Sequence, residues 1–171
     1  MTIQRVYNIF QQIGLVGQLA RAGEPNIFDS AESATGVSLV PGDGVYRNTS
    51  GQWIKPVDVA TRKLVTHIVS FDTSVVSTPI VSPTTNSIGQ IVYAAGSRVK
   101  ALAIGTLYAI AGEALVTGDK AIYNHSTGRW IKYAPVAGDI TDFRTAVFEA
   151  VSPAAADGDI FELRAYGPIK F

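Results

Sequence analysis

One pattern occurs twice in this chain: LVPGDGVYRNTSGQWIK at residues 39–55, and LVTGDKAIYNHSTGRWIK at residues 115–132. Both tryptophans of the chain lie in these two stretches. The copies lie about 76 residues apart, and their alignment places one inserted residue between Asp119 and Tyr123. A repeat at this spacing predicts a chain built from two related β units.

Each copy has the residue types of a β-hairpin. Gly-Asp is a turn signal, because glycine accepts positive φ angles and the aspartate side chain bonds nearby backbone amides. The loops at 47–51 and 124–128 each end in glycine and precede a strand that contains Trp-Ile-Lys. We expect the tyrosine and tryptophan rings to face each other across each hairpin, where such a pair contributes about 0.5–1.5 kcal/mol beyond area burial.

The aromatic side chains of the repeat are open to two interpretations. Rings at matching places in a β repeat are typical of hairpin and core packing, which we favour. The alternative is an exposed aromatic surface for a sugar ring or a partner protein, and the sequence does not decide between the two. The residues concerned are Tyr46, Trp53, Tyr123 and Trp130.

The composition indicates one compact body with a real core. Of the 171 residues, 47% are hydrophobic and 16% are charged, which is typical of a folded globular protein. The 14 basic and 14 acidic side chains give zero net charge and no basic stripe, so we expect no nucleic-acid partner. No stretch approaches the ~18 apolar residues of a membrane span, and the N-terminus lacks a secretory signal. We therefore expect no membrane partner and synthesis in a host cytoplasm.

From Val37 onward the sequence predicts an all-β fold. Short runs of Val, Ile, Tyr, Thr and Phe alternate with turn residues at intervals of about ten residues. We expect two related units, over about residues 37–76 and 90–171, to form a sandwich or barrel-like body (jelly-roll or β-tulip-like). The segment 77–89 contains two prolines and is either a link between the units or a long loop at one end of a sandwich; we favour the link, because the repeat falls on either side of it. The predicted strands are 37–41, 44–48, 52–56, 63–71, 75–78, 88–93, 98–104, 106–110, 113–116, 120–124, 129–133, 144–151 and 158–166.

Residues 1–23 form a predicted N-terminal arm, distinct from the β body over residues 24–171. The arm is extended or partly helical up to Gly14. It either packs on the core of its own chain or lies on a neighbouring subunit, because so apolar a segment is not stable in water. Residues 22–36 are rich in turn residues and predict a surface loop, with one short helical turn after Asp29. The apolar side chains of the arm are Ile3, Val6, Tyr7, Ile9, Phe10, Ile13, Leu15, Val16 and Leu19.

The sequence lacks the residue patterns of an enzyme or a metal site. There is no cysteine, which excludes disulfides and thiolate ligands. His67 falls within a predicted strand and His125 within a hairpin loop, and neither has a second ligand at the spacing of a zinc site. No nucleophile elbow, catalytic triad order or P-loop is present. We therefore expect no catalytic residues, no metal and no cofactor.

Several stretches resemble the structural cement and capsid decoration proteins of tailed bacteriophages. In the N-terminal half the similarity lies in a Gly-x-x-Gly-Gln-x-Ala segment, an acidic Ser/Ala-rich stretch and a glycine-containing strand. In the C-terminal half it lies in a Gly-Asp turn that leads into a tyrosine-containing strand, and in an Asp-Gly-Asp turn before a strand that ends in arginine. The stretches are residues 14–20, 26–33, 37–45, 118–123, 146–150 and 154–164.

The resemblance implies a structural virion protein that binds the outer surface of an icosahedral phage head and stabilises it by bridging major capsid protein subunits. It also implies a homo-oligomer on the capsid surface, more often a trimer than a dimer. The apolar arm is then the part expected to bind the partner. Two other hypotheses stay open: a receptor- or glycan-binding β module of a phage tail or adhesin, and a β-barrel that binds a small apolar molecule.

Overall fold

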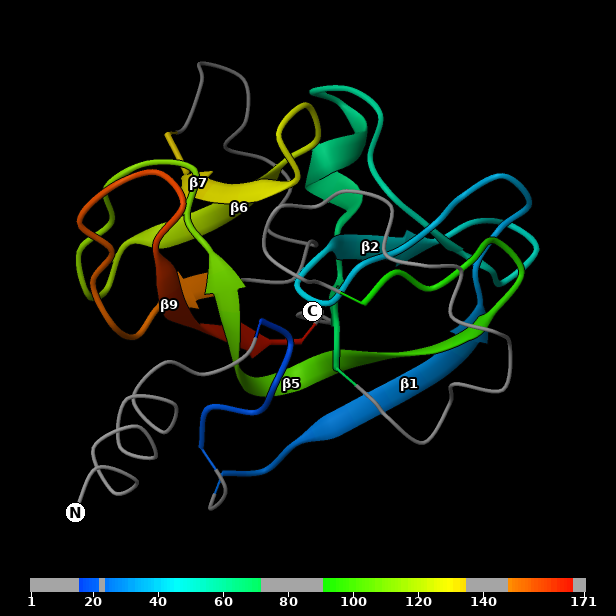
Figure 1. Cartoon of the computed structure of the whole chain (residues 1–171), viewed down its shortest axis with the longest axis horizontal. Helices are drawn as coiled ribbons and strands as arrows, with labels where there is room; N and C mark the ends of the chain where they lie inside the picture. Colours follow the sequence, from blue (N-terminus) through cyan, green and yellow to red (C-terminus); the bar gives the residue numbers. More distant parts are fainter. Residues whose placement is uncertain (1–15, 22–23, 72–90, 135–147, 168–171) are drawn as a thin grey trace, which may run out of the picture.

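The computed structural model describes residues 16–21, 24–71, 91–134 and 148–167 (Figure 1). These residues form an all-β fold, as predicted, and their only helical segment is a short 3₁₀ turn, η1 (Thr61–Leu64). The strands are β1 (Ile27–Glu32), β2 (Gly44–Arg47), β3 (Trp53–Ile54), β4 (His67–Val69), β5 (Arg98–Ile110), β6 (Lys120–Asn124), β7 (Arg129–Lys132), β8 (Phe148–Ala150) and β9 (Ile160–Tyr166).

The strands of the described residues form one antiparallel sheet around β5. The order of strands is β3-β2-β4-β5-β9-β8-β6-β7, and β1 also pairs with β5. The N-terminal part of β5 pairs with β1 and β4, and its C-terminal part pairs with β9. In Figure 1, β1 and β2 lie on one side of the molecule, β6, β7 and β9 lie on the other side, and β5 runs between them.

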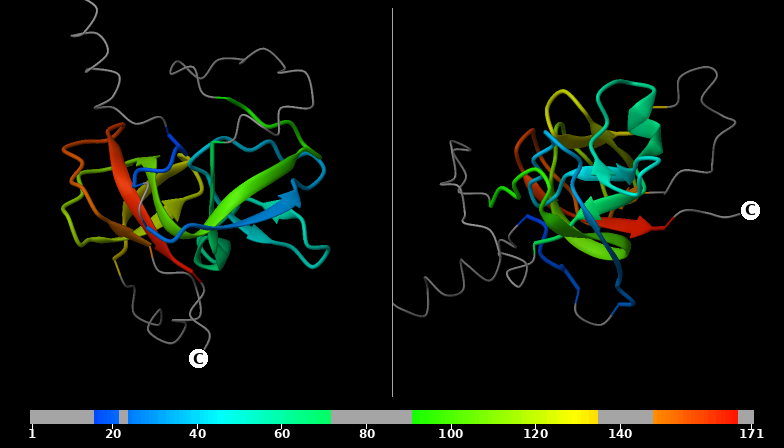
Figure 2. Two further views of the ribbon diagram at one scale, coloured as in Figure 1. Left: turned by 90° about the horizontal axis from the view of Figure 1, so that it is seen from below. Right: turned by 90° about the vertical axis from the view of Figure 1, so that its right-hand side faces the viewer.

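Each side of the molecule closes on itself through a single parallel bridge. We call β1 to β4 with the N-terminal part of β5 the first half, and the rest of β5 with β6 to β9 the second half (Figure 2). In the first half Ser33 bridges to Trp53, and in the second half Ala111 bridges to Trp130. Both halves are therefore barrel-like, and the tryptophans of the repeated pattern occupy the two closing positions.

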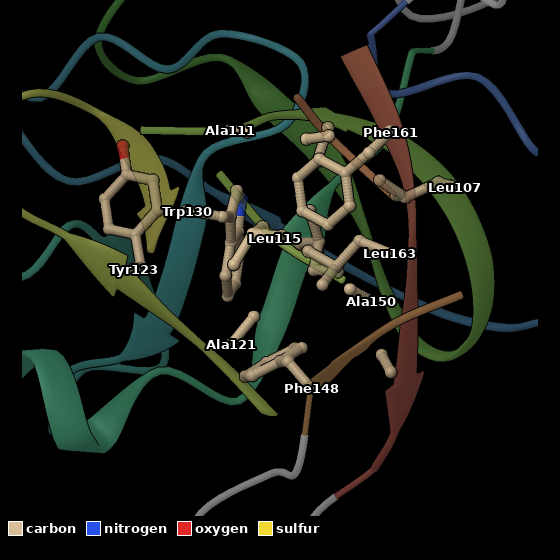
Figure 3. Close-up of a cluster of buried hydrophobic side chains, with 14 of the residues drawn as sticks. Leu107, Ala111, Leu115, Ala121, Tyr123, Trp130, Phe148, Ala150, Phe161 and Leu163 are labelled. Carbon is tan, nitrogen blue, oxygen red and sulfur yellow. The ribbon is translucent and has the colours of Figure 1, made fainter. Parts of the chain in front are cut away.

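Two clusters of buried side chains form the core, and the larger one extends from the second half into the first through Ile68 and Leu102. The larger cluster surrounds Trp130 and includes Phe148, Phe161 and Leu163 (Figure 3). The smaller cluster surrounds Trp53. Full burial of one large apolar side chain stabilises a fold by about 1.5–3 kcal/mol, so these clusters supply the main driving force for folding.

The surface loop expected over residues 22–36, with a helical turn after Asp29, is wrong. β1 occupies the middle of this segment and pairs with β5 over its whole length. Since β1 has β5 on one side only and is largely exposed, it tolerates polar residues such as Ser30 and Glu32. Those residues hide the alternation by which a strand is usually predicted.

The strand expected over residues 63–71 is shorter in the structure. Only β4, of three residues, belongs to the sheet. Upstream of it, the Asp58 carboxylate accepts hydrogen bonds from the Thr61 hydroxyl and backbone N–H, both at 2.7 Å. These bonds favour the 3₁₀ turn η1, which takes residues 61–64 out of the strand.

The strands expected at 98–104 and 106–110 are one continuous strand, β5. Gly105 lies at the predicted break and has a φ of +135°. A Cβ atom at this position would lie 2.2 Å from Asn26 Oδ1. Glycine therefore allows the chain to bend here without leaving the ladder.

Three other predicted strands, at 37–41, 88–93 and 113–116, have only single bridges among their described residues, and residues 88–90 lie outside the described part of the chain. These bridges join Leu39 to Tyr93 and Leu115 to Ala154. The other predicted strands within the described residues overlap β2, β3, β6, β7, β8 and β9. The proposed division into an arm and two repeat units stays a prediction. Outside the described residues lie the predicted strand 75–78, the link 77–89 and the helical pattern before Gly14.

Candidate interaction surfaces

The two copies of the repeated pattern have the same turn and the same ion pair. Asp43 and Asp119 each accept, through Oδ2, a hydrogen bond from the backbone N–H three residues earlier, at 2.8 and 3.0 Å. The returning strands place Lys55 Nζ 3.4 Å from Asp43 and Lys132 Nζ 2.7 Å from Asp119. The repeat is thus a repeat of geometry as well as of sequence.

The aromatic contacts of the two hairpins differ. Tyr123 is opposite Trp130, and their ring centres lie 5.4 Å apart in an edge-to-face arrangement, which confirms the expected pair. In the first hairpin Arg47, not Tyr46, is opposite Trp53. The expected contact of Tyr46 with Trp53 is therefore wrong. The Arg47 guanidinium lies 4.7 Å from the Trp53 ring centre instead, as a cation–π contact.

The extra residue of the second copy lies in its hairpin turn. Arg47 and Tyr123 are both opposite the tryptophan of their hairpin, so the strands that follow the two Gly-Asp turns have the same length. The predicted insertion between Asp119 and Tyr123 is wrong. An extra residue inside a strand would move every following side chain to the other face, whereas the turn at 124–129 absorbs it.

The two tryptophans are fully buried. Trp53 Nε1 donates a hydrogen bond to the Val99 carbonyl at 3.0 Å, and Trp130 Nε1 donates one to the Gly42 carbonyl at 2.9 Å. Tyr46 is half-buried. The indole rings therefore have their polar groups satisfied inside the protein, and neither has an exposed face on which a sugar ring could stack.

The contact between the two halves contains a buried polar pair. The Tyr123 hydroxyl donates to Asp43 Oδ1 at 2.5 Å, and both side chains are buried. Burial raises the pKa of the Asp43 carboxyl, and the Lys55 ammonium opposes this shift. Burial and the Asp43 carboxylate also raise the pKa of the Tyr123 hydroxyl, which stays a donor. We call Tyr123 and Trp130, together with Gly42 and Asp43, the seam.

The last part of the predicted arm belongs to the sheet. Residues 16–21 run along the C-terminal part of β5: Gly17 N–H donates to the Tyr108 carbonyl at 2.7 Å, and Ala20 N–H donates to the Thr106 carbonyl at 2.9 Å. Gly17 has a φ of +80°, and a Cβ there would lie 2.5 Å from Pro41 Cβ, so only glycine fits. We call residues 16–21 the arm root.

The arm residues named from the sequence divide into two groups. Val16 is buried and Leu19 is exposed. Leu19 forms an antiparallel bridge with Leu107 of β5. The described part of the arm thus packs on its own chain. The others lie outside the described residues: Ile3, Val6, Tyr7, Ile9, Phe10, Ile13 and Leu15.

Ion pairs attach the end of the arm root to β9. Arg21 donates from Nε and from a terminal nitrogen to Glu162 Oε2, both at 3.0 Å. Glu24 accepts from Arg164 at 2.5 Å and from the Thr106 hydroxyl at 2.7 Å, and these contacts lower the pKa of the Glu24 carboxyl, Thr106 most strongly. The ion-paired residues are separated by 141 and 140 positions, and Thr106 and Glu24 by 82, so no sequence pattern predicts these contacts.

The two histidines have different surroundings. The His67 ring is buried 4.8 Å from the Trp53 ring, with Nε2 3.1 Å from Asp29 Oδ2 and Nδ1 2.7 Å from the Thr66 hydroxyl. Burial lowers the pKa of His67, and Asp29 opposes this shift. His125 is half-buried in the β6–β7 turn, where its Nδ1 has no hydrogen-bond partner among the described residues.

An exposed apolar surface, which the sequence reading missed, lies between β3 and β4. The exposed fractions are 76% for Val57, 55% for Val59 and 47% for Leu64. The sequence offered one signal, namely three aliphatic residues within a short segment that is otherwise rich in turn and charged residues. We call residues 56–64 the β3–β4 loop.

Neither a metal centre nor a membrane span stands out in the described ranges. No group of three or more His, Cys, Asp or Glu side chains there is placed to hold a metal ion. No helix among those residues is long and apolar enough to cross a membrane. The arm root and the β3–β4 loop are the candidate interaction surfaces among the described residues.

The chain matches a known protein family. A family model described as structural cement protein (E217 gp24/Pam3 gp6) matches residues 3–165. The matched range covers both copies of the repeated pattern, the arm root and the β3–β4 loop. No curated protein matches the chain.

Proposed function

Because the chain belongs to the structural cement protein family of bacteriophages, it is a structural component of the phage capsid, and we propose that it binds the outer surface of the head and bridges major capsid protein subunits. The family match over residues 3–165 is the observation that carries this proposal. Synthesis in the host cytoplasm and assembly as a homotrimer, rather than a homodimer, are part of the same proposal.

The arm root supports a role for the arm in binding. Its backbone hydrogen bonds to β5, together with the Arg21–Glu162 ion pair, fix it to the sheet. Apolar residues that precede an anchored segment are held close to the body, which raises their effective concentration at a nearby partner. We propose that the arm side chains from Ile3 to Leu15 contact a capsid subunit or a neighbouring copy.

The mechanism needs binding energy and no chemistry. A protein that binds the closed shell, and not its opened states, stabilises the shell by the free energy of binding. When one oligomer contacts several capsid subunits, modest contacts combine, and the apparent affinity exceeds that of any one contact. Each bridged pair of subunits must then release its contacts before the shell can open.

The test is a truncation that respects the sheet. Deletion of residues 1–20 would remove nearly all of the arm root, so the truncated chain should lack residues 1–15 only. We expect the truncated chain to keep the circular dichroism spectrum of the full chain. It should bind expanded phage heads that lack this protein at least about tenfold more weakly. Full occupancy of the heads by the truncated chain would show that the arm is not the binding element.

A matched variant distinguishes the contribution of the apolar side chains of the arm from that of its length. Val6 and Phe10 replaced together by serine keep the chain length and remove two apolar side chains from the arm. The expected result is a loss of head binding close to that of the truncation. Binding equal to that of the full chain would mean that the length of the arm matters and its apolar side chains do not.

A further inference from the structure

The β3–β4 loop carries three exposed aliphatic side chains within eight residues. Val57 is the most exposed large apolar side chain among the described residues, and Val59 and Leu64 are also exposed. Single apolar side chains on a surface need no explanation, whereas three exposed within eight residues are a candidate contact for a partner. Val116, at 62% exposed, is equally accessible and lies in the turn before Asp119, which makes it a matched control.

The loop is held in one conformation by its own hydrogen bonds. The Thr61 hydroxyl accepts from the backbone N–H groups of Val57 and Asp58 at 3.0 and 3.1 Å. The Asp58 carboxylate in turn accepts from the Thr61 hydroxyl and backbone N–H, both at 2.7 Å. A loop fixed in advance loses little conformational entropy when it binds, so its apolar side chains contribute more of their burial energy to affinity.

Two polar groups without partners lie in the same region. η1 packs against β6, whose turn carries His125, and Figure 1 shows η1 beside that turn. Arg62 Nε on η1 and His125 Nδ1 are both shielded from water and have no hydrogen-bond partner among the described residues. Because Nε is shielded, an external group can reach the half-buried Arg62 only through the terminal nitrogens of its guanidinium. Arg62 has no ion pair among the described residues, which leaves its cation available to an external anion.

We propose that the β3–β4 loop binds a segment of the capsid protein that carries aliphatic side chains next to a carboxylate. The aliphatic side chains would cover Val57, Val59 and Leu64, and the carboxylate would accept hydrogen bonds from Arg62. A carboxylate is the group that matches a guanidinium in both charge and geometry. This inference rests on the proposed function and adds a second contact to that of the arm.

The test compares the loop with the matched control on the full chain. The double variant V57D/V59D places two carboxylates where the partner's apolar groups and carboxylate would lie. We expect its affinity for expanded heads that lack this protein to fall at least about tenfold. The variant V116D should bind within about twofold of the wild-type chain, since it introduces the same charge on another exposed turn. The melting temperatures should match that of the wild type, because all three positions are exposed.

The charge is tested separately. R62Q removes the cation and keeps polar side-chain nitrogen, and we expect about a tenfold weaker affinity for the same heads. Equal affinities of the wild type, V57D/V59D and R62Q would overturn the inference and leave the proposed function intact. Failure of the wild-type chain to bind heads would overturn the proposed function instead.

The identity of the occupant is tested by a photo-crosslinking residue placed at position 57. The expected product joins position 57 to a capsid-protein peptide with an aspartate or glutamate beside aliphatic residues. A product that joins two copies of this chain, or a capsid peptide without an acidic residue, would overturn the proposed chemistry. A native mass spectrum of V57D/V59D with fewer subunits than the wild type would overturn it as well, because the loop would then be a contact between copies.

Discussion

The first and second halves of the molecule have the same strand pairings but fill the space around their tryptophans differently. Trp130 lies between two aromatic side chains, Tyr123 and Phe148 (Figure 3). In the first half, Arg47 stands where Tyr123 stands in the second, and both are opposite the tryptophan. The backbone of the hairpin is therefore fixed by its turn and its tryptophan, and the neighbours of the ring can change from apolar to charged.

The two Gly-Asp turns also differ in the surroundings of their aspartate carboxylates. Asp43 and Asp119 accept the same backbone hydrogen bond and pair with equivalent lysines. Asp43 is buried against Tyr123 of the other half, whereas Asp119 is half-buried at the surface. One local motif thus serves as part of the seam in one copy and only as a turn in the other.

The largest effect on stability is expected when each tryptophan is replaced in turn. We expect Trp130→Ala to cost about 3–5 kcal/mol of unfolding free energy, as is usual when a buried tryptophan is truncated. Trp53→Ala should cost about 1 kcal/mol less. Both indoles lose a hydrogen bond to a buried carbonyl, but only the bond of Trp130 joins the two halves, and Trp130 also loses contacts with two aromatic rings. Urea unfolding monitored by circular dichroism measures both values. Equal losses would mean that the seam adds nothing beyond the two cores.

The seam hydrogen bond is tested by removing one oxygen atom. Tyr123→Phe leaves the buried Asp43 carboxyl without its 2.5 Å donor, and we expect a loss of about 1–3 kcal/mol in unfolding free energy. Tyr46→Phe is the control, since the Tyr46 hydroxyl makes no hydrogen bond within the described residues, and it should be nearly neutral. Urea titrations of both variants give the comparison. A neutral Tyr123→Phe would show that water replaces the hydroxyl and that the seam is open to solvent.

The elements that were predicted correctly have local causes. The Gly-Asp turns, the hairpins and strand β6 follow from residues within a few positions of one another, so the sequence alone predicted them. β1 was missed because it is an edge strand whose ladder depends on β5, far along the chain. The place of Arg47 opposite Trp53 was missed because one residue in a turn decides the register.

The candidate site was harder to predict for a related reason. The Arg21–Glu162 pair joins residues separated by 141 positions, and only the folded sheet brings them together. The division of the arm into an anchored root and the residues before it depends in the same way on the edge of β5. The burial of Trp53 and Trp130, by contrast, agrees with the packing interpretation that the repeat favoured.

A smaller effect is expected when the equivalent lysines are removed. Lys55→Met keeps the apolar stem of the side chain and removes the cation that lowers the pKa of the buried Asp43 carboxyl. We expect a loss of about 1 kcal/mol near pH 7. The pKa of Asp43 is raised in the folded state, so its ionisation costs stability as pH rises through that pKa, and the loss should shrink when the pH falls below it.

The matched variant Lys132→Met tests whether burial or pairing causes this effect. Asp119 keeps its backbone hydrogen bond and its contact with water, so the unfolding free energy should not change measurably. Urea unfolding at pH 4 and pH 7 separates the two variants. A similar loss in both would show that the lysine–aspartate ion pair, and not the burial of the Asp43 carboxyl, is responsible.

A small effect near neutral pH is also expected from His67→Phe, which gives the first half the aromatic pair of the second. His67 and Phe148 are equivalent: each lies 4.8 Å from the tryptophan of its half, at interplanar angles of 55° and 56°. The change at pH 8 should stay within about 1 kcal/mol, because a gain in apolar contact offsets the lost hydrogen bonds to Asp29 and Thr66.

The pH dependence distinguishes the two side chains. The pKa of His67 is lowered in the folded state from its ordinary 6.5, so at lower pH the unfolded chain binds the additional proton. The wild type should therefore lose stability as the pH falls below about 6.5, by at most about 1.4 kcal/mol per pH unit, and His67→Phe should lose less. Asp29→Asn removes the carboxylate that opposes the shift, so its stability should fall over a wider pH range. Thermal unfolding between pH 5 and pH 8 measures all three chains, and equal slopes for the wild type and His67→Phe would show that the buried histidine carries no proton-linked cost.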